Sequence, residues 1–237
     1  MAPRIAHPCS ICWLLSCLPL LLLAPSLRGQ TLFEDRFSDN RHGWPVMESR
    51  AQTTWFGDST YVIQIRSQAR NFAFLQPVVL PPEADFDLET ALWQEKGDKN
   101  MGLGLVWGAQ ADERDLFAFL VSTNGHYTLL RKERHAYHFI KPWTESSRVH
   151  GPKAWNVLRV SRRGDRISFF LNDEIVYTYA ADPWRGNHIG VLLHGSMKVE
   201  VKYLHMWIPD PAEPDREARE RPPHIPGELS APGGGGG

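Results

Sequence analysis

The chain has 237 residues, of which 42% are apolar and 11% aromatic, and it carries 26 basic against 27 acidic side chains. This composition suits one large folded domain and is not that of a disordered chain. Because there is no basic excess and no run of lysine or arginine, we expect no surface for nucleic acid or anionic lipid.

Residues 1–29 have the order of an export signal. The basic Arg4 precedes an apolar stretch at 11–23, and Pro25 follows at once. This stretch is shorter than the roughly 20 residues that cross a bilayer, so we expect a cleaved leader and no membrane span. The protein is then secreted, or periplasmic or held in the cell envelope.

All three cysteines, Cys9, Cys12 and Cys17, fall within this leader. The mature chain therefore has no thiol and no disulfide, and its stability must come from its core. Residues 14–17 also resemble a bacterial lipobox, which leaves lipidation of Cys17 as an alternative to simple cleavage.

Residues 30–208 predict a single all-β domain. Short apolar and aromatic segments alternate with turn residues, and no window keeps the apolar spacing of a helix for three turns. The clearest strands are 61–66, 85–93, 102–107, 116–121, 127–131, 156–161, 167–171, 175–179, 189–193 and 199–207.

Three connections predict hairpins, because 123–125, 163–165 and 172–174 place Gly, Asn or Asp where the backbone needs a positive φ. Neighbouring strands are therefore expected to be antiparallel. Beyond the domain, residues 209–237 are rich in proline, charge and glycine, which predicts a disordered tail.

The order of the motifs resembles the concanavalin A-like lectin and glucanase superfamily, in particular laminin G-like and keto-disaccharide-hydrolase-type domains of exported bacterial proteins. The resemblance implies an antiparallel β-sandwich of the jelly-roll kind and favours a glycan as ligand, although such relatives include binding modules, hydrolases and domains of no known role. The motifs are FEDRFSDN at 33–40, GLGLVW at 102–107, FAFLVS at 117–122, GHYTLL at 125–130, NVLRV at 156–160, ISFFLN at 167–172 and GVLL at 190–193.

Aromatic residues are the candidates for glycan contact, because sugar C–H faces pack on their rings while polar groups bond the hydroxyls. We predict a ligand site made of Trp93, Tyr127, Arg131, Tyr137 and Trp143. Trp143 is expected in a polar loop, and its alternative role is to cover an edge of the sandwich. Three other tryptophans lie in apolar strand contexts and are predicted in the core: Trp44, Trp155 and Trp207.

Three carboxylates alternate on one strand: Asp85, Asp87 and Glu89, with Phe86 and Leu88 facing the other way. Laminarinase-type hydrolases use a similar alternation, and neighbouring members, about 6.6 Å apart along a strand, come near the spacing of about 5 to 5.5 Å that retaining chemistry needs. This strand departs from that pattern in starting with Asp. The three carboxylates could instead form a solvated strand face or bind calcium.

Glycines alternate along 101–107 and leave one face of that strand bare, as close approach of another chain or a flat ligand would require; core packing is the commoner cause. The histidines of 135–138 lack the further ligands of a metal site, and we expect a solvated loop there. No cofactor is expected apart from calcium.

These patterns favour an exported, monomeric carbohydrate-binding domain that recognises a glycan on a concave face or rim loops, with Asp87 and Glu89 as further polar contacts. The alternatives are a glycoside hydrolase of the keto-disaccharide or laminarinase type, which would use Asp85, Asp87 and Glu89, and a protein-interaction domain without catalysis.

Export can be checked by mass spectrometry of the native protein. We expect an N-terminus near Ser26 or Gly29. An intact Met1 or Ala2 terminus would contradict export, and a diacylglyceryl group on Cys17 would favour the lipoprotein.

Overall fold

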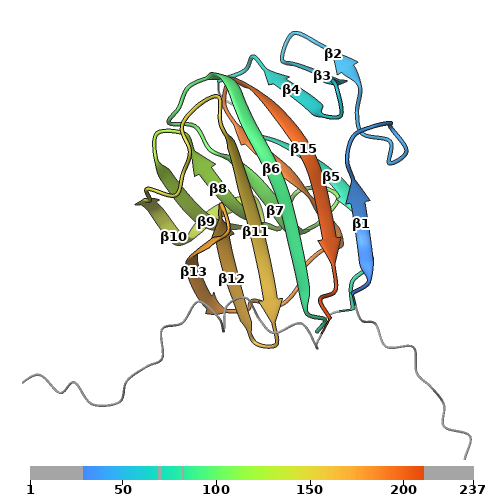
Figure 1. Ribbon diagram of the computed structural model, residues 1–237, viewed down its shortest axis with the longest axis vertical. Coiled ribbons are helices and arrows are strands. Elements are labelled where there is room, and N and C mark those ends of the chain that lie inside the picture. Colours follow the sequence, from blue (N-terminus) through green and yellow to red (C-terminus); the bar gives the residue numbers. More distant parts are fainter. Residues whose placement is uncertain (1–28, 69–70, 82, 211–237) are drawn as a thin grey trace, which may run out of the picture.

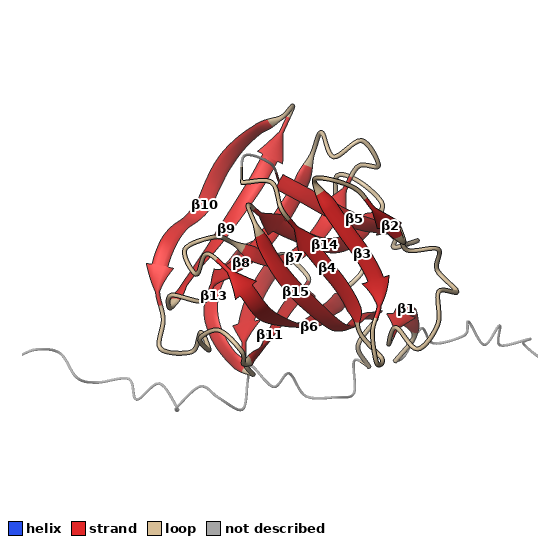
Figure 2. Ribbon diagram, turned by 90° about the horizontal axis from the view of Figure 1, so that it is seen from above, coloured by secondary structure: helices blue, strands red, loops and turns tan. Residues whose placement is uncertain are grey.

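The computed structural model describes residues 29–68, 71–81 and 83–210, which form two antiparallel β-sheets packed face to face. No helix occurs in these residues, and therefore none that is long and apolar enough to cross a membrane. Figure 1 shows the long strands of one sheet in front of the other, and Figure 2 shows both sheets from above. The predicted all-β sandwich is confirmed, while residues 1–28 of the predicted leader and 211–237 of the predicted tail lie outside the described residues.

The larger sheet, sheet A, has nine strands in the order β13-β12-β11-β6-β15-β4-β3-β2, with β1 also paired to β15. Its central strands, β6 and β15, are among the longest in the molecule. Its strands are β1 (Thr31–Asp35), β2 (Met47–Glu48), β3 (Gln52–Phe56), β4 (Tyr61–Ile65), β6 (Phe86–Gly97), β11 (Trp155–Arg163), β12 (Arg166–Leu171), β13 (Glu174–Ala180) and β15 (Met197–Trp207).

The smaller sheet, sheet B, has six strands in the order β10-β9-β8-β7-β14-β5. Its two edges are therefore β10 and β5. Its strands are β5 (Asn71–Pro77), β7 (Leu103–Ala109), β8 (Leu116–Ser122), β9 (His126–Glu133), β10 (Ala136–Glu145) and β14 (His188–His194).

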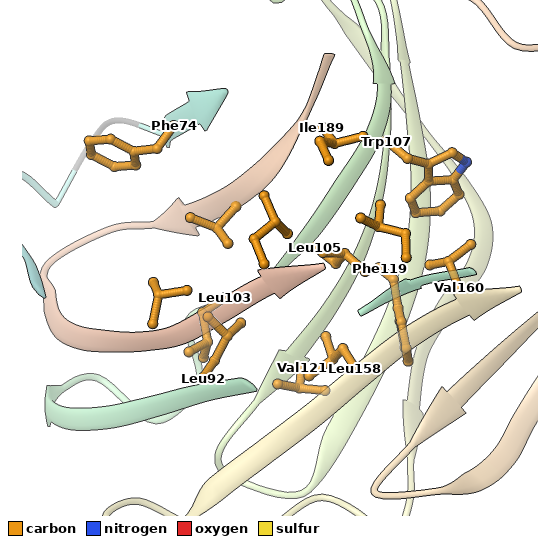
Figure 3. Packing of buried hydrophobic residues seen from close by; sticks show 14 of the residues in the cluster. Phe74, Leu92, Leu103, Leu105, Trp107, Phe119, Val121, Leu158, Val160 and Ile189 are labelled. Carbon is orange, nitrogen blue, oxygen red and sulfur yellow. The ribbon is translucent and has the colours of Figure 1, made fainter. Parts of the chain in front are cut away.

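The main core lies between the sheets and follows from the alternation of apolar residues along each strand. In β11, Leu158 and Val160 are fully buried and face the interior, while Arg159 points outward. Figure 3 shows Leu92 and Leu158 of sheet A packed against side chains of sheet B. The predicted facing of the 85–93 strand is confirmed, since Phe86 and Leu88 are buried in this core.

The predicted hairpin turns are present. Asn172 and Asp173 both have positive φ, at 51° and 69°, as a two-residue hairpin turn requires, and Gly125 and Gly164 have φ of 102° and 57°. In addition, Trp44 is a core residue, as predicted, and its indole nitrogen donates a hydrogen bond of 2.8 Å to a carboxylate oxygen of Asp35.

One prediction is wrong. The segment around His135 and Trp143 was expected to be a polar loop, but it forms the turn and edge strand β10, with register irregularities on both sides of Lys141. Proline and lysine are common on edge strands, where they blunt unpaired backbone groups, and irregular register breaks the alternation by which strands are recognised. Among the described residues, this strand carries the large aromatic side chains that are most exposed: Tyr137, Phe139 and Trp143.

Sheet B is unusual in burying its outer face as well. Every residue of β7 and β8 is buried, and a second apolar cluster lies on the outer side of these strands. Glycines allow neighbouring strands to approach closely here: a Cβ on Gly104 would overlap the carbonyl of Phe119, and one on Gly190 would overlap that of Phe74. The cluster consists of Val106, Ala109, Leu116, Ala118, Leu120, Leu130 and Leu192.

Gly190→Ala should therefore destabilise the domain by about 3 kcal/mol, because the added methyl group has to displace backbone. Urea unfolding followed by circular dichroism measures this. Gly151→Ala is the matched control, since the nearest atom to its added Cβ is 4.0 Å away. Equal midpoints for the two variants would contradict this account of the sheet.

Candidate functional site

The exposed large aromatic side chains of the described residues are all on β10. Tyr137, Phe139 and Trp143 are 38%, 57% and 38% exposed. Phe139 lies opposite Leu130, which belongs to the outer cluster, so Phe139 and Tyr137, two positions earlier, face the outer side of sheet B. Figure 2 shows β10 beside β9 along one side of the molecule.

Strand β10 reaches across the sheet to which it belongs. The amide nitrogen of Asn71, on the opposite edge strand β5, donates a hydrogen bond of 3.0 Å to the hydroxyl of Tyr137. The ring of Tyr137 also contacts that of His194 edge to face, with centroids 6.3 Å apart. Twisted sheets bring diagonal corners toward one another, and here the two edges meet above the outer cluster.

Trp143 packs onto the bare face of the glycine-rich strand. The atoms nearest to a Cβ position on Gly102 are Trp143 Cη2 and Leu120 Cδ1, each 3.2 Å away, and His194 Nδ1 at 3.4 Å. The close approach that the alternating glycines predicted is thus made by an indole of the same chain. One part of the ring is buried and the rest remains exposed.

His194 lies beneath these aromatic rings on β14. Burial lowers the pKa of its imidazole from 6.5 to about 4, so the ring is neutral at pH 7. Its Nε2 atom is buried and has no hydrogen-bond partner in the described part of the protein. Such a group costs free energy unless a partner bonds it, so this imidazole is a strained polar group beneath the aromatic rings.

Polar side chains cluster at the end of the sheet near Gly102. Asn124 donates a hydrogen bond of 2.8 Å to Asn100, accepts one of 2.6 Å from Ser122, and lies 3.1 Å from a ring nitrogen of His126. Asn100 is two residues before Gly102, against which Trp143 packs. Amide and imidazole groups of this kind are suited to bonding hydroxyls at the rim of an aromatic surface.

The other predicted ligand residues lie elsewhere. Tyr127 is only 4% exposed, faces the main core and donates a hydrogen bond of 2.9 Å to the carbonyl of Val176. Arg131 is partly buried on the same side of β9, between the carboxylates of Glu133 and Asp182 at 3.4 and 3.8 Å. Neither side chain joins Tyr137 and Trp143.

The carboxylate strand belongs to the other sheet. Asp87 is 2% exposed and is paired with Arg163 at 2.7 Å and Arg159 at 3.8 Å, while Glu89 accepts a hydrogen bond of 2.7 Å from Tyr203. Asp85 accepts a 2.6 Å hydrogen bond from a backbone N–H of the β11–β12 turn. These contacts tie β6 to its neighbours. Asp87 Oδ1 and Arg159 Nη2 are nevertheless buried without a hydrogen-bond partner in the part of the chain that the structure describes.

Two tryptophans predicted in the core are in fact partly exposed on the outer face of sheet A. Trp155 lies directly opposite Trp93, and Trp207 lies opposite Asp87. The assignment was one position out of phase, because the inward residue of β11 is the buried Asn156, whose amide is bonded to the backbone of His150. Burial of a polar residue with satisfied bonds is not visible in the apolar pattern.

No described group of three or more His, Cys, Asp or Glu side chains is arranged to hold a metal ion. Among the described residues of sheet B, the side chains suited to ligand binding are therefore the β10 aromatic residues, His194 and the nearby amides. We call this surface the β10 face, defined by Asn71, Tyr137, Phe139, Trp143 and His194.

No family model matches the sequence, and no curated protein matches it either. Solved structures are similar in fold: a Bacillus subtilis carbohydrate-binding module, CBM66 (12% identity, 70% of this chain and 95% of that chain, TM-score 0.53), and a Bacillus licheniformis β-glucanase (7%, 75% and 98%, 0.56). A third is a Bacillus subtilis protein of unknown function with a galectin-like fold (10%, 76% and 97%, 0.56). The predicted fold, an antiparallel β-sandwich of the jelly-roll kind, is thereby confirmed.

The lowered pKa of His194 predicts a pH dependence of stability. The unfolded chain takes up a proton near pH 6.5, whereas the folded protein does so only near pH 4. The free energy of unfolding should therefore fall as the pH drops from 6.5 to 4, by at most about 3 kcal/mol from this group. Urea unfolding of wild type and His194→Gln across this range measures the effect, and an equally steep fall in the variant would contradict it.

Proposed function

We propose that this protein is an exported carbohydrate-binding domain whose β10 face holds a glycan. The observation that carries the proposal is that, among the described residues, the exposed large aromatic side chains all lie on one strand, beside the polar groups of Asn71, Asn100 and Asn124. Sugar rings have apolar C–H faces and peripheral hydroxyls, and this surface offers ring faces and polar groups side by side. The leader predicted at residues 1–29 supports export.

The contacts of each residue on the β10 face indicate whether it would stack on a sugar or bond its hydroxyls. Trp143 and Phe139 present ring surface for stacking, and Tyr137 is held in place by its bond to Asn71. The neutral ring of His194 supports Tyr137 from beneath, and Asn100 and Asn124 contact the sugar units that extend past Trp143. Lys132, whose amine lies 5.5 Å from the centre of the Tyr137 ring, borders the surface.

The similar structures support the same proposal. The CBM66 module is named for carbohydrate binding, and the β-glucanase for action on a glucan. We favour binding over catalysis because the carboxylates of Asp87 and Glu89, on which a laminarinase-type reaction would depend, are engaged by neighbouring side chains of sheet A: Arg163, Arg159 and Tyr203. They do not lie beside the β10 aromatic residues.

A glycan array probed with the mature protein identifies the ligand, and calorimetry with the best neutral oligosaccharide then tests the site. Trp143→Ala should weaken binding about tenfold, the effect of losing one stacking contact of about 1.5 kcal/mol. His194→Gln should weaken it by a similar factor. Trp93→Ala, on the other sheet, is the matched control and should leave the affinity unchanged.

Binding that survives Trp143→Ala and Tyr137→Ala would remove the β10 face as the site. Turnover of an oligosaccharide by the wild-type protein, abolished by Glu89→Gln, would replace the binding proposal with a hydrolase. Circular dichroism of each variant establishes that a loss of binding is not a loss of folding.

A further inference from the structure

A transverse row of tryptophans crosses the outer face of sheet A, on the far side of the sandwich from the β10 face. Trp155 lies opposite Trp93, Trp93 opposite Glu200, Glu200 opposite Val62, and Val62 opposite Trp55. Residues directly opposite in paired strands point to the same side of a sheet. The three indoles therefore lie on one line across five strands, β11, β6, β15, β4 and β3.

The dimensions of this row match a chain of sugars. Neighbouring strands are about 4.8 Å apart, so the row from β11 to β3 spans roughly 19 Å, which is the length of several sugar units. All three tryptophans are partly exposed, and the rings of Trp93 and Trp155 are 5.9 Å apart at an angle of 35°. None of the three indole N–H groups donates to an acceptor in the described protein, so each is available to a ligand.

The charges beside the row determine which kind of glycan it suits. Lys198 lies 5.4 Å from the centre of the Trp55 ring and is already paired with Glu95. Glu200 accepts a hydrogen bond of 3.2 Å from Thr60. Glu95 is therefore paired with a cation, whereas Glu200, which lies in the row itself between Trp93 and Val62, is bonded within the described residues only to a neutral hydroxyl.

Two lysines at the β11 end of the row, Lys202 and Lys153, are not paired in the way that Lys198 is. Lys202 occupies an irregular position in the pairing of β15 with β6, is exposed, and holds its amine 5.5 Å from the centre of the Trp155 ring. Lys153, two residues before Trp155, is also exposed. Within the described residues neither ammonium has a carboxylate partner. A cation over an exposed ring is held weakly, so an incoming carboxylate can replace the ring as its partner.

We propose that this row is a second binding site, for a linear polysaccharide that carries carboxylates, such as a polymer of uronic acid. The sugar rings stack along Trp155, Trp93 and Trp55, and the carboxylates pair with Lys202 and Lys153. The unpaired positive charge of Lys202 and Lys153 at the β11 end complements an acidic chain. The site shares no residue with the β10 face and stands independently of it.

Affinity electrophoresis and calorimetry with polygalacturonate test this proposal, with a neutral β-glucan of similar length as the comparison ligand. Wild type should bind polygalacturonate, and binding should weaken as salt screens the exposed charges. Trp155→Ala should reduce the affinity about tenfold, as expected for one lost stacking contact. Lys202→Gln should reduce it about two- to fivefold and make it less sensitive to salt.

The control is Trp143→Ala, which alters the β10 face and should not change binding of polygalacturonate. Lys202→Gln replaces an exposed side chain, so it remains decisive if Trp155→Ala fails to fold. No binding of polygalacturonate by wild type would overturn the proposal, and so would binding that Trp155→Ala and Lys202→Gln leave unchanged. Equal, salt-independent binding of the neutral glucan would show that the acidic class is wrong, and loss only in Trp143→Ala would place the ligand on sheet B.

Discussion

The burial of both faces of sheet B is the constraint on which the rest of the structure depends. A sheet in a two-layer sandwich usually packs one face on the core and leaves the other in water. Here β7 and β8 are buried on both sides, so their outer cluster needs a cover of its own. The edge strand β10 supplies it by reaching over the sheet as far as Asn71, and in doing so it carries its aromatic side chains to the outer surface.

The two outer faces of the sandwich consequently differ in chemistry. On sheet B the exposed rings rest on an apolar layer that contains a neutral histidine. On sheet A the surface is more polar, with the buried Asp87 held between two arginines and a line of half-buried indoles at one end. Stacked sheets are about 10 Å apart, so ligands on the two faces would not touch. A protein with both sites would link two polysaccharides when both faces are occupied at the same time.

Much of the architecture could be predicted from local sequence. The alternation identified the core-facing side chains of β6 and, at Leu158 and Val160, of β11, although Trp155 of β11 was assigned to the wrong face. The turns at Gly125, Gly164 and Asn172 indicated antiparallel neighbours. Strand β10 could not be found in this way. Its turn residues, Arg134 and His135, adopt positive φ without glycine or asparagine, and its register slips twice, so neither the turn signal nor the alternation was present.

The sequence by itself therefore determined the fold class, the identity of most strands and the aromatic residues from which a ligand surface could be chosen, because these follow from propensity and period. Only the tertiary structure decided which of those residues meet. Trp93 and Trp143 were predicted in one site but lie on opposite faces, since the order of strands in each sheet is a long-range property. The pairing of Trp155 with Trp93 and the position of His194 under Tyr137 depend on that same order.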